Sequence, residues 1–566
     1  MARSPSPGRL PPGERAPYQF KPHERPFMPG SPATPDHPLP RRIGYFLVGV
    51  LLGIAGGFAN GLLLGNTQQI QGAFGLSSVE VGWLAAAYSM TNVCTSMMLV
   101  KFRQQFGVAL FARIFLPAFA IVSCAQLFLD SYPLELLLRG ISGIVGSGLT
   151  SFALFYFMQS MTPATRLAGM VLGVGMSQVA LPFARAISPL LLAQGDIHHL
   201  FAFELGLSLL CLAGTAVLPL PPSETFDAFE PLDFVSFGLL APGLALLCGV
   251  LSQGRTVWWT TPWIGWALAG AIVLIAAVNA IEHNRANPLL NIRWMASRNI
   301  VLFTLLAATM RVLLSEQGFG SVGLLTVLGM GPDQLVKFYA VVTLASICGL
   351  VVGVVTLNPN DVLRPLLVST ALIGIAAWMD SDATNLTRPA NLYFSQALIA
   401  FATLLFVGPL MMIAMFRALS RGPSHMVSYT AVFGISQTVA GLAGTALLGS
   451  IQIARERLYS NELVQGIQLT DPLDVNRMAQ LSGAYARVLG DPALRQAEGA
   501  ALLGQQVTRE ANVLAYNDVF LLIALLAAVA FVLIAARWLY FRRKGINPLA
   551  EDIAALQKLR QARANG

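Results

Sequence analysis

About fourteen long apolar segments follow one another along this chain, and each has roughly the length that a helix needs to cross a lipid bilayer. An α-helix rises about 1.5 Å per residue, so roughly 20 residues span the hydrocarbon core. Hydrophobic residues make up 55% of the 566 residues and charged residues 11%, against about 25% charged in soluble domains. A water-soluble core cannot bury that much apolar chain. The sequence therefore predicts an all-α integral membrane protein.

The predicted spans form two sets of seven, with boundaries set to within a few residues. The first set covers residues 43–65, 79–100, 108–129, 134–157, 167–193, 200–218 and 232–252. The second set covers residues 262–281, 300–328, 334–356, 364–379, 391–416, 427–452 and 517–541.

The positions of basic residues predict the orientation of the chain. Lysine and arginine concentrate in cytoplasmic connections. Arg41 and Arg42 precede the first span, and Arg542, Arg543 and Lys544 follow the last. Both termini are therefore predicted to be cytoplasmic. The net charge of +8 and the isoelectric point near 9.4 are interpreted as this topology signal, and no nucleic-acid partner is predicted.

Two segments outside the spans have distinct compositions. Residues 1–42 are rich in Pro, Ser, Gly and Arg and show no apolar period, which predicts a disordered cytoplasmic tail. Residues 453–515 are polar, with Leu481, Tyr485 and Val488 at helical spacing. We expect short amphipathic helices there, on the outer face. They serve either as a passive connector or as a docking surface for a partner protein.

Several short motifs stand at fixed places relative to the spans. They are Trp83-Leu84-Ala85-Ala86-Ala87-Tyr88, Arg139 with Gly143, Ser252-Gln253-Gly254-Arg255, Asn287-Pro288-Leu289-Leu290, and Tyr516-Asn517-Asp518-Val519-Phe520. Together they resemble the fourteen-helix drug:proton antiporter (multidrug efflux) branch of the major facilitator superfamily. The resemblance covers nearly all of residues 43–541, and the chain looks like a divergent member.

The resemblance implies a domain organisation for the chain. It predicts the major facilitator superfamily fold, with about 14 transmembrane helices in two six-helix bundles plus two extra helices. The N-terminal bundle is expected at residues 43–218, the two linking helices with their loops at 219–299, and the C-terminal bundle at 300–541. The outer segment 453–515 belongs to the C-terminal bundle, and residues 542–566 form a cytoplasmic tail.

Three positions depart from the family pattern. Asn60 stands in the first span where family members usually carry an aspartate. The connection from Lys101 to Gly107 lacks the aspartate of the corresponding family loop, and Arg185 stands in the fifth span where a glycine is expected. Because an asparagine cannot take up a proton, these departures leave room for a narrower or acidic substrate.

A charge at mid-bilayer costs about 2.5 to 3.5 kcal/mol, so a spanning helix keeps one chiefly where it faces a cavity or a partner, and five charged residues form the shortlist for that depth. They are Arg139, Arg185, Glu204, Arg311 and Glu316. The resemblance places the ninth span at the cavity, so Glu316 is the candidate proton-coupling group. The alternative is a structural ion pair between Glu316 and Arg139 or Arg185.

Arg185 and Glu204 are expected at similar depths in adjacent antiparallel helices, which predicts a structural ion pair. Alternatively, Arg185 binds an anionic substrate group with help from Arg139 and Asn60. The candidate substrate-cavity residues are Asn60, Arg139, Arg185, Arg311 and Gln317. Met411, Met412 and Met415 provide either an adaptable apolar wall for a ligand or core filler.

The predicted function is secondary active transport by alternating access, with proton-coupled efflux of small amphiphilic compounds. The alternatives are import of an anionic metabolite and a non-transporting membrane scaffold or receptor. No enzyme, cofactor or metal site is predicted, because no catalytic or metal-binding cluster is evident. The expected partners are the substrate, protons and the lipid bilayer. The resemblance also implies a cell inner membrane location and a periplasmic adaptor leading to an outer-membrane channel.

Overall fold

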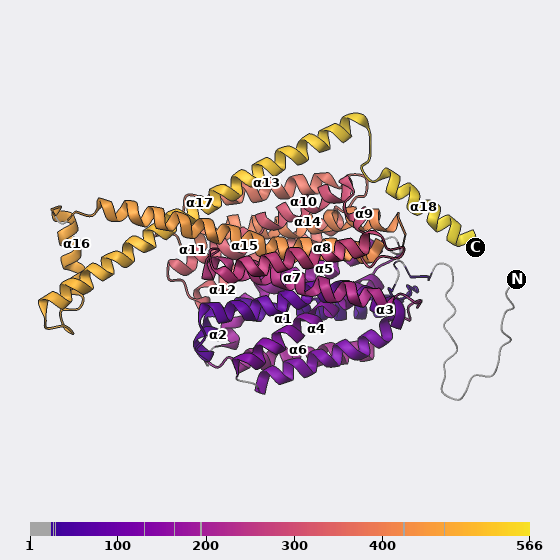
Figure 1. Cartoon of the computed structure of the whole chain (residues 1–566), viewed down its shortest axis with the longest axis horizontal. Helices are drawn as coiled ribbons and strands as arrows, with labels where there is room; N and C mark the ends of the chain where they lie inside the picture. Colours follow the sequence, from indigo (N-terminus) through magenta and orange to yellow (C-terminus); the bar gives the residue numbers. More distant parts are fainter. Residues whose placement is uncertain are drawn as a thin grey trace.

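The computed structural model describes residues 24–565, apart from residues 27, 29, 129–130, 164, 193–194, 423–424 and 469. Most helices in this part run along the long axis of the molecule (Figure 1). Thirteen of the described helices are long and apolar enough to cross a membrane. One of them, α3 (Ser78–Phe128), contains two crossings. The prediction of an all-α membrane protein with about 14 spans is confirmed.

The chain reverses inside α3 at Gly107, whose φ of 78° and ψ of 165° are not helical. Glycine adopts a positive φ without steric cost because it has no Cβ. A Cβ at this position would also lie 3.2 Å from Ser223 Oγ. Gly107 therefore separates the second predicted span from the third.

The first group of helices, called here the N-terminal bundle, packs around α1. Helix α1 contacts α4, α5 and α6, and α3 contacts α4 and α6. Gly143 lies so close to α3 that a Cβ would meet the Tyr88 carbonyl oxygen at 2.3 Å. The bundle comprises α1 (Leu39–Gly65), the short α2 (Thr67–Phe74), α3, α4 (Tyr132–Ser160), α5 (Arg166–Leu191) and α6 (His198–Val217).

Two further helices, α7 (Pro231–Val257) and α8 (Pro262–His283), lie beside both groups of spans. They pack against each other, and α7 also contacts α3 and α15. The short helix α9 (Ile292–Met295) follows them.

The second group of helices is called here the C-terminal bundle. Within it, α12 packs on α14, α13 on α14 and α17, and α15 on α10 and α17. Its first span combines α10 (Arg298–Leu313), a π-helical turn (Glu316–Ser321) and α11 (Val322–Val327). The other elements are a 3-10 turn (Pro332–Leu335), α12 (Val336–Val355), α13 (Leu363–Asp380), a 3-10 turn (Pro389–Leu392), α14 (Tyr393–Leu419), α15 (His425–Gly466), α16 (Pro472–Gly483), α17 (Pro492–Lys544) and α18 (Ala550–Asn565).

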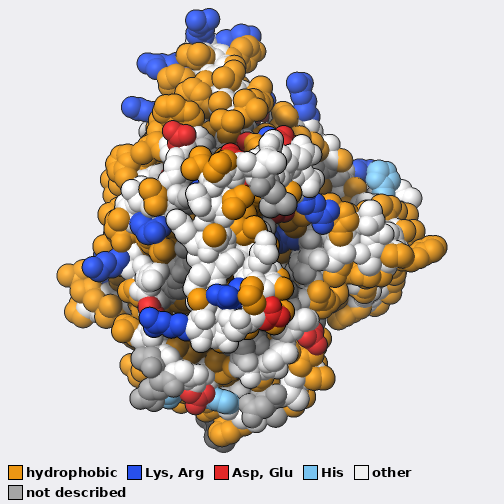
Figure 2. Space-filling view, turned by 90° about the vertical axis from the view of Figure 1, so that its left-hand side faces the viewer, with side chains coloured by type: hydrophobic (Ala, Val, Ile, Leu, Met, Phe, Trp, Pro, Cys, Tyr) orange, Lys and Arg blue, Asp and Glu red, His pale blue; other side chains and the backbone are white. Residues whose placement is uncertain are grey.

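Helices α15 and α17 extend far beyond the other spans and form an outer arm that α16 closes at its tip (Figure 1). The prediction of short helices between residues 453 and 515 is wrong except for α16. Most of that segment continues α15 and α17. Figure 2 looks onto this end of the molecule: hydrophobic side chains surround its margin, and charges of both signs are scattered over its middle.

Part of the N-terminal tail packs on the opposite end of the molecule. The Ala33 N–H donates to the Pro222 carbonyl oxygen at 2.8 Å, and Gln159 Nε2 donates to the Ala33 carbonyl oxygen at 2.7 Å. Arg166 reaches the Thr34 carbonyl oxygen at 2.8 Å. The prediction of a disordered tail is therefore wrong at Ala33 and Thr34, whose backbone groups bond to the N-terminal bundle and its following linker. Residues 1–23 lie outside the described residues.

A cluster of charged side chains joins α7 and α8 to the N-terminal bundle at the end where the tail packs. Lys101 Nζ pairs with Asp233, whose other oxygen lies 2.7 Å from Arg285. Arg285 also contacts Glu282 at 3.0 Å and Glu230 at 2.8 Å. Hydrogen bonds from Arg285 and Asn287 lower the pKa of Glu230, which lies just before α7. Asp233 thus supplies an acidic partner for a loop that lacks its own aspartate.

We expect Asp233→Asn to destabilise the folded protein by about 3 kcal/mol or more, because it leaves buried basic groups without their partner. The measurement is the thermal midpoint of the purified full-length chain in detergent. The matched control is Asp227→Asn, which removes an exposed carboxylate from the same linker. Equal midpoints for the two variants would contradict a structural role for this cluster.

Candidate functional site

Two buried carboxyl groups meet in the C-terminal bundle through one amide. Gln396 Nε2 donates to Glu316 Oε1 at 2.9 Å and to Asp380 Oδ2 at 2.8 Å. Glu316 and Gln396 are 0% exposed and Asp380 is 3% exposed. The second Glu316 oxygen is buried without a hydrogen-bond partner. No described cation forms an ion pair with either carboxylate, so a proton is the simplest species that would neutralise them.

The local structure around Glu316 brings this carboxyl group to its partners. Glu316 begins the π-helical turn in the first span of the C-terminal bundle, and π-helical turns occur frequently at functional sites. Asp380 is the last residue of α13, and Gln396 lies in the first turn of α14. Gln317 Nε2 donates to the Gln396 carbonyl oxygen at 3.1 Å, which holds the glutamine in place.

The sequence analysis missed Asp380 and Gln396. Asp380 directly follows the predicted span 364–379, so it was not counted among the intramembrane charges. A span extended by one residue would have included it. Gln396 carries no charge, and no sequence signal marks it.

A second buried polar cluster lies in the N-terminal bundle around Arg139. Its Nε lies 3.3 Å from Glu135 Oε1, one helical turn earlier in α4, and its Nη1 donates to the Ala59 carbonyl oxygen at 2.6 Å. Gln126 Nε2 donates to the same Glu135 oxygen at 3.2 Å. Glu204 also interacts electrostatically with Arg139. The spacing of four residues marks Glu135 as the natural partner of Arg139, although the sequence analysis did not use it.

The predicted ion pair between Arg185 and Glu204 is wrong, since no such pair forms between these described residues. Glu204 interacts electrostatically with Arg139 instead, and Arg185 contacts Tyr339 of the C-terminal bundle. The Arg185 guanidinium lies 5.4 Å from the Tyr339 ring centre, with Nη1 3.5 Å from the hydroxyl oxygen. The alternative ion pair between Glu316 and Arg139 or Arg185 is likewise not formed. Helix packing decided the partner of Arg185, because it brings α5 against α12.

A cavity of about 310 Å³ lies between the two bundles. It extends from the middle of the spans toward the tail, and α3, α4, α5, α14 and α15 provide most of its wall. Its lining residues are Met28, Ser31, Asn92, Val93, Ser96, Val100, Arg103, Ser147, Thr150, Ser151, Leu154, Phe155, Met170, Val174, Ser177, Gln178, Met411, Met426, Tyr429, Thr430, Phe433, Gly434, Gln437 and Thr438.

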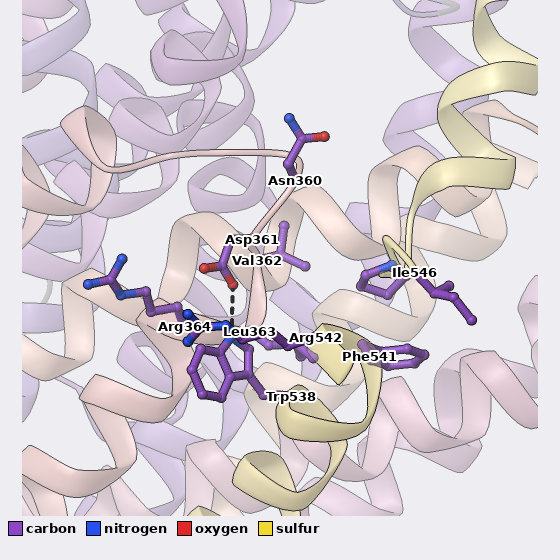
Figure 3. A pocket seen from close by; sticks show the side chains of 10 residues that line it. Asn360, Asp361, Val362, Leu363, Arg364, Trp538, Phe541, Arg542 and Ile546 are labelled. Atoms are coloured by element: carbon purple, nitrogen blue, oxygen red, sulfur yellow. Dashed lines mark hydrogen bonds between the residues drawn. The ribbon is translucent and has the colours of Figure 1, made fainter. Parts of the chain in front are cut away.

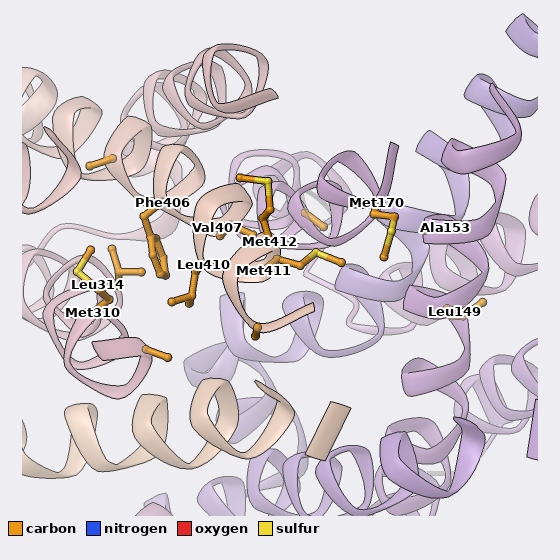
Figure 4. Close-up of a cluster of buried hydrophobic side chains, with 14 of the residues drawn as sticks. Leu149, Ala153, Met170, Met310, Leu314, Phe406, Val407, Leu410, Met411 and Met412 are labelled. Carbon is orange, nitrogen blue, oxygen red and sulfur yellow. The ribbon is translucent and has the colours of Figure 1, made fainter. Parts of the chain in front are cut away.

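The cavity wall is apolar and aromatic with small hydroxyl groups, and Arg103 is the only charged residue among the described residues that line it. The Arg103 guanidinium lies 5.1 Å from the Phe155 ring centre, and its Nε is buried without a hydrogen-bond partner. Figure 4 shows Met411 of α14 and Met170 of α5 between the two bundles. Met411 therefore lines the cavity, whereas the fully buried Met412 and Met415 fill the core.

None of the five candidate cavity residues from the sequence is among those that line this cavity. Arg139 and Arg185 have the partners described above, and Asn60 Oδ1 is buried without a hydrogen bond. Gln317 lies beside Gln396. Arg311 comes nearest, because its Nε donates to the carbonyl oxygen of the lining residue Gln437 at 3.2 Å.

The packed tail forms one end of the cavity. Met28 and Ser31 line it, and both are buried. Ser31 Oγ donates to the Met28 carbonyl oxygen at 2.8 Å, which fixes this turn of the tail. At the other end of the spans, the Arg185 contact with Tyr339 joins the two bundles. The tail thus forms part of the cavity wall, whereas Arg185 and Tyr339 do not line the cavity.

Comparison with known proteins gives one family and several relatives. The Major Facilitator Superfamily profile matches residues 43–445. The multidrug export protein EmrB of Haemophilus influenzae is 24% identical over 476 residues, covering 81% of this chain and 88% of that protein. EmrB of Escherichia coli K12 is 23% identical over 491 residues, covering 83% and 89%.

A solved structure supports the same fold. The crystal structure of the human organic anion transporter MFSD10 aligns with a TM-score of 0.51 at 15% identity, covering 87% of this chain and 100% of that one. At this sequence identity, the structural similarity shows a shared fold and nothing more. The resemblance to the drug:proton antiporter branch, drawn from short motifs, agrees with the EmrB relatives. From its sequence profile, its relatives and its fold, this chain belongs to the Major Facilitator Superfamily as a divergent membrane transporter.

Proposed function

We propose that this protein is a proton-coupled exporter of small amphiphilic compounds that works by alternating access in a cell inner membrane, with both termini in the cytoplasm. The observation that carries the proposal is the buried pair of Glu316 and Asp380, bridged by Gln396 and lacking a cation. Two carboxylates that share one amide donor repel each other, and a proton on either removes the repulsion. The multidrug export relatives support the outward direction.

The energy of one proton suits this task. A proton that crosses with its charge gains about 2.3 kcal/mol per 100 mV, which supports a substrate gradient of about fiftyfold. Asp380, at the end of α13 nearest the outer arm, is the residue through which we propose that protons enter from outside. Protonation of the pair would then favour one arrangement of the first span of the C-terminal bundle, where the π-helical turn carries Glu316.

The cavity between the bundles is the proposed substrate site. Its size and apolar walls suit a drug-sized amphiphile, and methionine side chains adapt to differing shapes. Arg103 is its only described charge, so an uncharged or carboxylate-bearing compound fits better than a cation. The same arginine also suits import of an anionic metabolite, which is the second candidate function.

We expect Glu316→Gln and Asp380→Asn each to lower substrate-driven proton movement by about a hundredfold, the scale contributed by a positioned proton-transfer group. The measurement uses liposomes with an imposed pH gradient and an internal pH dye. The double variant should lose no more proton movement than either single variant, because the two carboxyl groups act as one unit. Asp333→Asn, an exposed carboxylate of the same bundle, is the control. Full coupling in Glu316→Gln would refute the assignment.

We expect Arg103→Gln to weaken binding of a carboxylate amphiphile by about tenfold to a hundredfold, because a hydrogen bond to a charged group contributes about 1.5 to 3 kcal/mol. The affinity of the matched neutral amide should change little. Both affinities are measured on the purified protein by tryptophan fluorescence. Arg113→Gln, an exposed arginine of α3, is the control variant. Equal losses of affinity for the acid and for the amide would contradict a role of Arg103 in recognising the charge of the ligand.

The outer arm is the proposed docking surface for an adaptor protein that leads to an outer-membrane channel. Leu473 is 77% exposed and Val488 is 79% exposed at its tip, which favours a partner over a passive connector. We expect replacement of residues 467–491 by a flexible linker to leave transport in liposomes intact and to abolish drug resistance in cells. Retained resistance in cells would refute the docking role, and lost liposome transport would show that the arm supports the fold.

A further inference from the structure

A cavity of about 450 Å³ opens on the side of the molecule opposite the outer arm, between the connection of α12 to α13 and the end of α17. It lies apart from the proposed substrate cavity and shares no lining residue with it. Its lining residues are Asn360, Asp361, Val362, Leu363, Arg364, Trp538, Phe541, Arg542, Ile546 and Pro548. The proposed transport cycle assigns no role to any of them.

The charges of this cavity suit a singly charged anion. Arg364 and Arg542 line it, and neither forms an ion pair among the described residues. The one carboxylate, Asp361, accepts a hydrogen bond from Trp538 Nε1 at 3.2 Å (Figure 3). The Arg542 guanidinium lies 5.0 Å from the Trp538 ring centre. Two arginines and one aspartate leave a net charge of one positive unit, which a phosphodiester matches.

The surroundings of the cavity resemble a membrane interface. Arg364 lies at the start of α13, and Val368 and Ile375 follow it at helical spacing on the same face, 43% and 52% exposed. An apolar stripe therefore leads from the arginine along the span. Aromatic and basic side chains gather where a spanning helix leaves the bilayer, and Trp538 and Arg542 stand at that point of α17.

We propose that this cavity binds the headgroup of an anionic phospholipid of the cytoplasmic leaflet. The two exposed arginines would hold the phosphate, and the acyl chains would lie along Val368 and Ile375. Basic pockets between spanning helices on the cytoplasmic side suit such headgroups. The apolar stripe favours a lipid over free phosphate, because inorganic phosphate has no apolar part to cover it.

The test counts bound lipid on the purified, delipidated full-length chain by native mass spectrometry during titration with phosphatidylglycerol. Each arginine removed should weaken binding by about fivefold. The double variant Arg364→Gln with Arg542→Gln should therefore lose more than tenfold. The control variant, Arg543→Gln with Lys544→Gln, removes equal charge from the same helix end outside the cavity. Its affinity for phosphatidylglycerol should fall less than threefold.

Two further titrations separate the sources of the phosphate group. Phosphatidylethanolamine should bind more weakly than phosphatidylglycerol, and millimolar inorganic phosphate should fail to displace the bound lipid. Equal losses in the cavity variant and the control variant would overturn the proposal in favour of diffuse attraction. Displacement of the lipid by inorganic phosphate would overturn the proposal in favour of a site for free anions. Equal binding of the two lipids would overturn it because the site would not select an anionic headgroup.

Discussion

A charge inside a membrane-spanning helix must find its partner within the protein, because lipid offers neither water nor counter-ions. This requirement accounts for the buried polar contacts of Arg139 in the described part of the chain. Arg139 contacts Glu135 and interacts electrostatically with Glu204. Glu316 and Asp380 depart from the pattern, since both acids bond to one amide and no cation among the described residues pairs with them. Because no described side chain neutralises these carboxylates, we propose that the transported proton binds there.

The proposed coupling pair and the proposed substrate cavity lie at different places. The first span of the C-terminal bundle contributes a residue to the pair and contacts the wall of the cavity. Glu316 begins the π-helical turn that follows α10. Five residues earlier in the same span, Arg311 donates to the carbonyl oxygen of Gln437, which lines the cavity. A rearrangement of this span would therefore reach the cavity wall directly. Separate sites joined by a rigid helix suit a carrier that exchanges a proton for an unrelated molecule.

The family pattern was informative both where the chain follows it and where it departs from it. The loop after the second span lacks the family aspartate, and its Lys101 pairs with Asp233 of the extra helix α7. This pair ties α7 to the N-terminal bundle. Arg185, at a position where a glycine was expected, contacts Tyr339 of the opposite bundle. In the proposed alternating-access cycle, this contact between the bundles would have to break for the cavity to open on that side.

The sequence by itself determined the spans, the all-helical class and the family, because hydropathy and short motifs are local properties of the chain. It also identified Glu316 and Arg139 as unusual, since a charge within an apolar run is visible without a structure. Only the tertiary structure decided the partners: Asp380 and Gln396 for Glu316, Glu204 for Arg139 and Tyr339 for Arg185. Partners on different helices depend on how each helix is rotated and which neighbour it packs against. Those choices arise from contacts between residues far apart in sequence, which a single sequence does not display.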